Sequence, residues 1–281
     1  MKTIAFALIV ALSAAAAPAA AGQHAGHTQE KPKPAPPPAG KPAEPLPPFI
    51  PPVTDDDRKA AFPDVEGHAV HDNAVNYFVL FDQLEWQAGN DVSGVNVDTT
   101  GWVGGDRDRL WFRAEGDSDN GRLADAEAHV LYGRKFARWW DLVAGVRQDF
   151  NPGPSRTWAA VGVQGLAPYW FEVEATFYIG ESGRTHARFD VEYELLLTNR
   201  LVLQPLVEVD VYGKSDPERA IGAGLSTIDT GLRVRYEIRR ELAPYIGVTW
   251  NRKFGQTAEL AEAAGKDPGG ARFVAGLRLW F

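Results

Sequence analysis

The sequence contains no cysteine, and Met1 is its only methionine. The lack of cysteine excludes disulfide bonds, thiolate zinc sites and catalysis by a thiol. Together, the two absences leave a soft metal ion without a sulfur ligand once Met1 has been removed. An excess of positive charge is missing as well, because 29 basic residues stand against 37 acidic ones and give a net charge of −8. We therefore expect no nucleic-acid partner, since such a protein presents a basic face.

Long hydrophobic runs are also missing beyond the N terminus. No later stretch approaches the roughly 18 apolar residues of a membrane-spanning helix. Residues 1–21 place Lys2 before a short, Ala-rich apolar stretch and a run of small residues, which is typical of a secretory signal peptide. The alternative is an uncleaved membrane anchor, but the stretch is short and ends at Pro18, which favours cleavage near Ala21. We expect an exported protein that has no transmembrane helix.

Residues 22–74 are predicted to form a periplasmic tether or plug without a core of its own. Within them, residues 31–52 read KPKPAPPPAGKPAEPLPPFIPP, a composition that favours a disordered, extended, polyproline-like chain. A single helical turn is expected near residues 54–62, capped by Thr54 and ended by Pro63.

From residue 75 to the end, apolar and polar residues alternate along the chain. In one segment Phe189 and Val191 alternate with Arg188 and Asp190, which predicts a strand with two different faces. The lengths are close to the roughly 9–11 residues of a tilted membrane strand. Tight turns alternate with longer loops, as in outer-membrane barrels. About twelve strands are expected, near residues 75–87, 96–105, 108–116, 124–134, 139–149, 156–166, 169–180, 186–197, 200–212, 225–238, 241–253 and 271–281.

A soluble β-sandwich or a lipocalin-like barrel would show the same alternation, with its apolar face inward. The even strand number and the dense charge of the polar face favour an outer-membrane barrel. The last strand ends on Phe281, which resembles the signal that such barrels present to the outer-membrane barrel assembly machinery. The predicted fold is all-β, a transmembrane antiparallel up-and-down β-barrel over residues 75–281, with its apolar face against outer-membrane lipid. Pro205 cannot donate to the ladder, so a bulge is expected there.

The polar faces of the strands predict a lumen with charges of both signs. Two readings stay open: acids and bases that pair across a narrow lumen, or a path or site for cations. The second reading is most plausible where acids recur at every second position on adjacent strands, as at Glu172 and Glu174. The residues expected to point inward are Glu127, Asp141, Asp149, Glu172, Glu174, Asp190, Glu192, Glu194, Glu208, Asp210, Asp229, Glu237, Arg109, Arg113, Arg134, Arg147, Arg188, Arg233, Arg235, Arg272 and Arg278.

Six histidines supply the other candidate metal ligands. Oxygen ligands alone favour Ca²⁺ or Mg²⁺, whereas imidazoles shift the preference towards copper, nickel or zinc. The first candidate site is the H-x-x-H-D sequence just before the first strand, and two lumen pairs come second. For each of them the alternative is an ordinary polar or hydrogen-bonded residue. The candidates are His68, His71 and Asp72, then Glu127, His129, Glu172 and Glu174, and more weakly His24 and His27.

An enzyme is not expected. Twelve-stranded outer-membrane phospholipases need a serine and a histidine on the lipid-facing surface, together with a polar partner. The segment GESGRTH brings Ser182 and His186 close in sequence, but no third group is apparent.

Long runs of the barrel region resemble the copper-resistance protein B family of outer-membrane proteins. The runs include FARWWDLVAGVRQDF, the stretch from PGPSRTWAAVGVQGLAPYWFEVEATF to GKSDPERAIGAGLS, and RFVAGLRLWF, and together they cover nearly all of residues 76–281. The resemblance implies a copper-binding barrel that contributes to copper tolerance. Sequestration of copper or its passage across the outer membrane would be the means, alongside periplasmic copper-handling proteins.

One departure from the family bears on the metal. Its members usually carry an N-terminal extension rich in Met and His, whereas this extension is rich in proline and holds only four histidines, His24, His27, His68 and His71. Thioether ligation of Cu(I) is therefore excluded, and Cu(II) bound by imidazole and carboxylate is favoured. The rival hypothesis is a general diffusion porin or structural barrel whose lumen charges only pair with each other.

Overall fold

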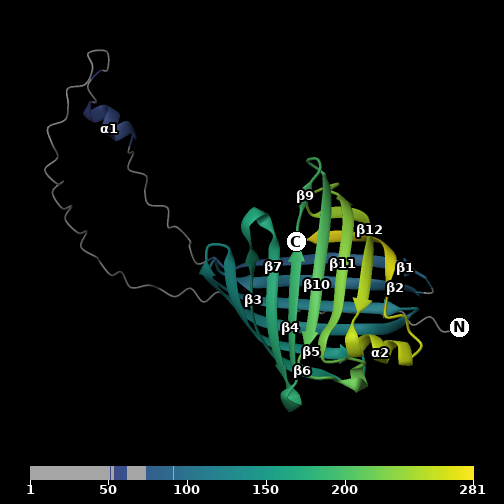
Figure 1. The fold of residues 1–281 in the computed structure, drawn as a ribbon. Coiled ribbons are helices and arrows are strands. Elements are labelled where there is room, and N and C mark those ends of the chain that lie inside the picture. Colours follow the sequence, from purple (N-terminus) through teal and green to yellow (C-terminus); the bar gives the residue numbers. More distant parts are fainter. Residues whose placement is uncertain (1–50, 52–53, 62–73, 91) are drawn as a thin grey trace, which may run out of the picture. The chain divides into compact units, whose positions relative to one another are not determined.

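The computed structural model describes residues 51, 54–61, 74–90 and 92–281 (Figure 1). The chain divides into two compact units, residues 1–68 and 69–281. The predicted signal peptide and the four histidines of the extension, together with Asp72, lie outside the described residues. No helix in the described part is long and apolar enough to cross a membrane.

A short helix, α1 (Asp55–Ala61), confirms the predicted helical turn. Thr54 caps it, because its hydroxyl accepts the backbone N–H of Asp57 at 3.2 Å and donates to the Asp57 carboxylate at 2.6 Å. These hydrogen bonds hold the pKa of Asp57 below its usual value.

The second unit is one closed antiparallel barrel. Each strand pairs with its neighbours in sequence, and the ring closes between the first and last strands and between β10 and β11. β8 and β9 both pair with β10 in one register, so they occupy one position in the barrel wall. The thirteen labelled strands therefore fill twelve positions around the ring, each of which is called a stave below. The strands are β1 (Asn76–Gly89), β2 (Val92–Gly104), β3 (Asp108–Asp119), β4 (Arg122–Ala137), β5 (Trp140–Asn151), β6 (Arg156–Leu166), β7 (Glu172–Gly180), β8 (Thr185–Glu192), β9 (Leu195–Leu196), β10 (Leu201–Tyr212), β11 (Gly224–Tyr236), β12 (Leu242–Lys253) and β13 (Gly269–Trp280).

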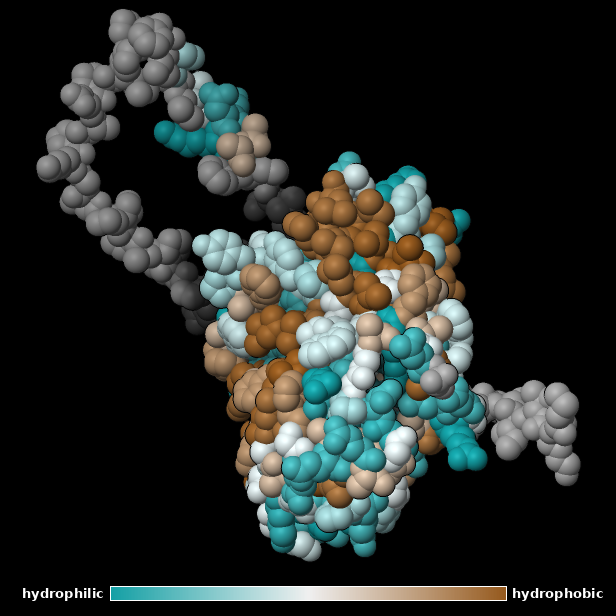
Figure 2. All heavy atoms as spheres, turned by 45° about the vertical axis from the view of Figure 1, so that its right-hand side comes forward, coloured by the Kyte–Doolittle hydropathy of each residue, from teal (hydrophilic) through white to brown (hydrophobic). Residues whose placement is uncertain are grey.

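The barrel wall is apolar outside and polar inside, which confirms the predicted assignment of the two faces. Along β5, for example, Leu142 and Val146 are exposed while Arg147 and Asp149 are buried. Figure 2 shows hydrophobic residues gathered over the wall, with hydrophilic ones towards the lower end of the view. This is the surface of a protein whose surroundings are lipid, because water would penalise so large an exposed apolar area.

The two rims of the barrel differ, as the alternation of turn lengths predicts. β1 begins and β13 ends at the rim of the short turns, one of which contains η1 (Pro168–Trp170). The other rim carries η2 (Glu181–Gly183), η3 (Pro217–Arg219) and a helix, α2 (Gly255–Ala263), in a segment expected to be only a long loop. Thr257 of α2 accepts the backbone N–H of Gly222 at 2.9 Å, so two of these long connections pack together.

The expected bulge at Pro205 is wrong. Pro205 pairs with Leu232 of β11 in unbroken register, and the pairing with β8 and β9 keeps one register on both sides of it. The irregularity lies in the neighbouring stave, where β8 ends at Glu192 and β9 begins at Leu195. The missing N–H of a proline therefore interrupts the partner strand instead of kinking its own.

Candidate functional site

The lumen holds two rows of carboxylates. Within each row, the register places the acids of adjacent strands at directly paired positions. The first row crosses β2 to β5 as Asp98, Glu115, Glu127 and Asp149. The second row crosses β7, β8, β10 and β11 as Glu174, Asp190, Glu208 and Asp229. Like charges in directly opposed positions destabilise a sheet unless a cation compensates them. Each row is therefore stable only if positively charged groups inside the barrel compensate its carboxylates.

Arg147 compensates two carboxylates of the first row. Its guanidinium lies 2.5 Å from Glu127 and 2.6 Å from Asp149, and all three side chains are almost completely buried. Asp149 also accepts a hydrogen bond from the indole of Trp158 at 2.9 Å and forms an ion pair with Arg219 at 3.2 Å. Charge-assisted bonds of this kind offset the free-energy cost of burying a carboxylate.

Arg188 connects the two rows. Its Nη1 lies 2.8 Å from Glu127 and 3.1 Å from Glu115, both in the first row. Its Nε lies 3.2 Å from Glu208 in the second row and 3.0 Å from Asp210. One guanidinium thus compensates carboxylates of three other strands.

His186 is fixed in the lumen as a neutral imidazole. Arg147 carries only donors, so the 3.2 Å contact from its Nη1 makes His186 Nδ1 the acceptor. The Nε2–H then donates to Asp210 at 2.6 Å. The ring stacks between Tyr178 and Tyr212, with ring centroids 4.9 and 4.1 Å away. Ser182 is exposed in η2, so the loose serine–histidine pair does not meet on the lipid-facing surface.

The predicted pair Glu127 and His129 shares an inward face, and His129 Nε2 lies 3.0 Å from Glu127 Oε1. The other ring nitrogen, Nδ1, is buried without a hydrogen-bond partner. Glu127, however, already meets Arg147 and Arg188. The pair therefore shares the expected inward face, and its carboxylate is held by arginines.

The predicted pair Glu172 and Glu174 lies on β7 opposite Glu192 and Asp190 of β8. Arg113 reaches Glu174 from β3, across the lumen, and donates to Gln164 at 2.5 Å. Glu172 is exposed at the short-turn rim, and among the described residues it forms no ion pair with an arginine or lysine. The two predicted lumen pairs therefore stay separate, because Glu174 contacts Arg113 whereas Glu127 contacts Arg147 and Arg188.

Sequence reasoning missed the inward acids of the first strands. Asp82 and Glu85 are three positions apart, which breaks a period of two, and a register shift between Phe81 and Leu84 turns both inward. Arg278 contacts Asp82 at 2.6 Å, and Arg233 contacts Glu85 at 2.9 Å. The other acids missed there are Asp98, Glu115 and Asp117. Of the expected inward arginines, Arg134 instead lies half exposed near the rim, 3.8 Å from Asp108.

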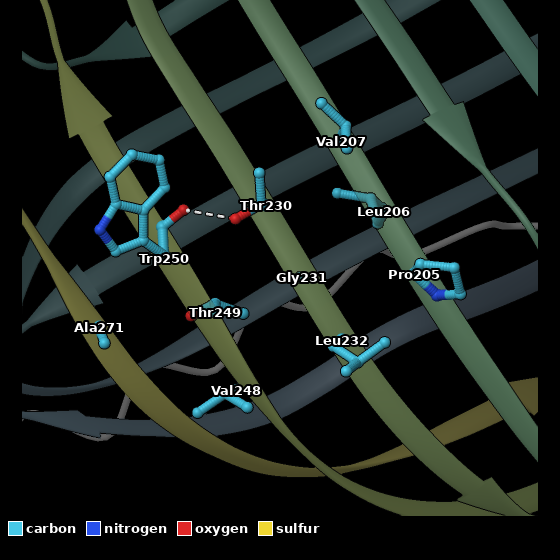
Figure 3. Close-up of a pocket in the computed structure, with 10 residues that line it drawn as sticks. All are labelled: Pro205, Leu206, Val207, Thr230, Gly231, Leu232, Val248, Thr249, Trp250 and Ala271. Carbon is cyan, nitrogen blue, oxygen red and sulfur yellow. Dashed lines mark hydrogen bonds between the residues drawn. The ribbon is translucent and has the colours of Figure 1, made fainter.

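Residues 51, 54–61, 74–90 and 92–281 contain no group of three or more His, Asp or Glu arranged to hold a metal ion. The other candidate ligands, His24, His27, His68, His71 and Asp72, are outside these residues. A groove of 340 Å³ lies on the outer wall and is lined by uncharged residues such as Pro205, Leu232 and Val248 (Figure 3). With no charged group, it is suited to acyl chains and not to cations.

The sequence relatives decide the family. The profile of the family described as "Copper resistance protein B precursor (CopB)" matches residues 75–281. Copper resistance protein B of Escherichia coli is 53% identical over 232 residues, which is 83% of this chain and 78% of that protein. The chain belongs to the copper resistance protein B family. The copper resistance protein B homolog of Pseudomonas syringae pv. tomato is also 53% identical, over 83% of this chain and 79% of its own length.

Among solved structures, the NanC porin is similar, with a TM-score of 0.49 and 14% identity over 73% of this chain and 99% of that one. The assignment to the copper resistance protein B family depends on the sequence relatives, and it agrees with the resemblance seen in the barrel segments. The family and the apolar outer wall together place the barrel in the bacterial outer membrane.

Proposed function

We propose that this copper resistance protein B family member binds copper ions and contributes to their sequestration or their passage across the outer membrane. The observation that carries the proposal is the pair of carboxylate rows, whose opposed acids draw cations into the lumen. Asp98 and Asp190 form no ion pair with any arginine or lysine of the described residues, so their oxygens stay available as ligands for a cation.

Cu(II) is the proposed ion. A mature chain without methionine or cysteine offers only imidazole, carboxylate and backbone ligands, which suit Cu(II) better than Cu(I). The H-x-x-H-D sequence of His68, His71 and Asp72 is the proposed capture site, and it precedes β1, which begins at the short-turn rim. The proposed second site is in the lumen, at Glu127 and His129 or at Glu172 and Glu174.

The proposed arrangement in the cell follows from this order. The short-turn rim and residues 22–74 face the periplasm, where copper-handling proteins would exchange the ion with the histidine pairs. The role is that of a binding and transport protein and not an enzyme, and the assembly machinery recognises β13 with the Phe281 that follows it.

A copper titration of the full-length protein refolded in detergent tests the proposal, with zinc and calcium for comparison. We expect His68→Ala with His71→Ala to weaken Cu(II) binding by more than about tenfold, the lower bound for losing even an outer-shell partner of a metal ligand. His24→Ala with His27→Ala is the matched control in the same segment and should have a smaller effect.

The lumen sites are tested by Glu127→Gln with His129→Ala and by Glu172→Gln with Glu174→Gln. The double change Glu259→Gln with Glu262→Gln removes two exposed carboxylates from α2 and serves as the control. A lumen variant that loses binding would place the site in the barrel. If the wild-type protein binds copper no better than zinc or calcium, the proposal is wrong and the general porin is the better description.

A further inference from the structure

Among the described residues, Arg188 forms the ion pair that crosses the most strands of the barrel. It projects from β8, and two of its partners, Glu115 and Glu127, lie on β3 and β4. Along one direction of the ring, β4 to β7 separate β3 from β8. Along the other direction, β9 shares its stave with β8, and β10, β11, β12, β13, β1 and β2 lie between. In a ring of twelve staves, the contact to Glu115 therefore joins nearly opposite walls.

The surroundings of this guanidinium hold it there. Arg188 is 9% exposed, and its four carboxylate partners come from β3, β4 and β10. Asp210 is in turn fixed by His186, and Glu127 by Arg147. Two of the partners are thus held in place from behind, and Arg188 spans the gap between the walls beside a shorter link from Arg147 on β5 to His186 on β8.

A second arginine that crosses the lumen, Arg113, has fewer carboxylate partners. Arg113 reaches from β3 to Glu174 on β7 and to Gln164 on β6, and the Glu174 side chain is 37% exposed. Removing Arg113 leaves one half-hydrated carboxylate without its cation, whereas removing Arg188 takes a cation from four carboxylates and leaves two of them, Glu115 and Glu208, with no other basic partner among the described residues. Arg188 therefore compensates more lumen carboxylates than Arg113 does.

We propose that Arg188 is the residue that closes the lumen to small ions and sets its charge selectivity. With the guanidinium in place, the two carboxylate rows are tied together and an ion meets a buried positive charge. When the guanidinium leaves, the same place presents Glu115 and Glu208 without a basic partner, next to Glu127 and Asp210, and this excess of carboxylates repels anions and attracts cations. The inference rests on the proposed passage of cations through this lumen, but its test needs no copper.

The test is the conductance of the full-length protein in planar lipid bilayers in KCl, together with the reversal potential under a KCl gradient. We expect Arg188→Met to raise the single-channel conductance about tenfold and to favour K⁺ over Cl⁻, since a cleft lined by one sign of charge concentrates counter-ions by about tenfold or more. Arg134→Met is the control, because Arg134 lies half exposed at the rim, 3.8 Å from Asp108, and forms no ion pair with a carboxylate of the two rows.

A charge-matched variant separates the bridge from the charge. Arg188→Met with Glu115→Gln removes one positive and one negative charge, so its net charge equals that of the wild type. We expect it to conduct more than the wild type while preferring K⁺ less than Arg188→Met does. Folding of each variant is checked by the shift in gel mobility on heating.

The outcomes are distinct. A folded Arg188→Met protein whose conductance stays within about twofold of the wild type overturns the proposal, whatever the copper titration gives. If that variant does not fold, Arg188→Lys decides the question, because one ammonium cannot donate to both walls as the guanidinium fork does. A raised conductance of the lysine variant supports the proposal, and an unchanged one overturns it. Failure of copper binding with a raised conductance would reject the proposed function alone.

Discussion

At the scale of single residues, the packing inside the barrel depends on glycines that lie beneath aromatic rings. A Cβ added to Gly133 would lie 2.6 Å from Nε1 of Trp111, and one added to Gly180 would lie 2.6 Å from the ring of Trp158. Gly276 stands in the same relation to Tyr245. An aromatic side chain that covers a glycine of a neighbouring strand replaces the contacts that the glycine lacks. These glycines therefore make room for the rings that fill part of the lumen.

Gly133→Ala should lower the free energy of unfolding by about 1–3 kcal/mol, the usual cost of overpacking a close-packed interior. The reason is the backbone of β4, which holds the new methyl group against Trp111. Gly116→Ala is the matched control, because a Cβ there would have no heavy atom within 4 Å. Urea unfolding of the refolded barrel, followed by tryptophan fluorescence, measures both. Equal stability of the two variants would mean that the Trp111 ring shifts without cost.

At the scale of elements, the break between β8 and β9 has one cause in the sequence. Tyr193 donates its N–H to the Pro205 carbonyl at 3.1 Å, but Pro205 has no N–H to return. The stave therefore continues in register while losing half of one hydrogen-bonded pair. Beyond the break, the exposed leucines Leu195, Leu196 and Leu197 form the end of a hairpin that is supported on one side by β10.

Pro205→Ala should join β8 and β9 into one strand. The restored donor contributes roughly 0.5–1.5 kcal/mol, and the lost rigidity of proline offsets about 0.4–1 kcal/mol of it. The net change in stability should therefore be within about 1 kcal/mol, so the better measurement is amide hydrogen exchange over residues 193–197, which should slow. Pro244→Ala on β12 should leave exchange in that segment unchanged. Unchanged or faster exchange in Pro205→Ala would show that something other than the proline breaks the stave.

At the scale of the whole molecule, the sequence predicts the positions of the strands better than it predicts which side chains of different strands meet. The alternation places β6 at Arg156–Leu166, as observed, because each face has one kind of surroundings. It misses the inward turn of Asp82 and Glu85, since a register shift changes the face without a signal in composition. The sequence also does not predict that Asp98 pairs with Glu115, because this pairing depends on the register of two strands. For the same reason, Arg188 could be placed in the lumen but not between the two rows.

The apolar outer wall makes a prediction about where the barrel resides. Val248 is at the middle of β12 and is 52% exposed, whereas Val103 is 36% exposed and lies next to the end of β2 at the short-turn rim. In a bilayer, Val248→Arg should cost about 2–4 kcal/mol of stability, and Val103→Arg about 0–1 kcal/mol, because the cost of a lipid-facing charge falls towards the interface. Unfolding of both variants in lipid vesicles measures the difference. A β-barrel with an aqueous exterior would tolerate both arginines equally, so equal stabilities would contradict the membrane location. A larger loss for Val248→Arg than for Val103→Arg would locate the hydrocarbon layer along the strands. The carboxylate rows would then lie in the lumen at the level of this layer, where the barrel wall separates them from lipid.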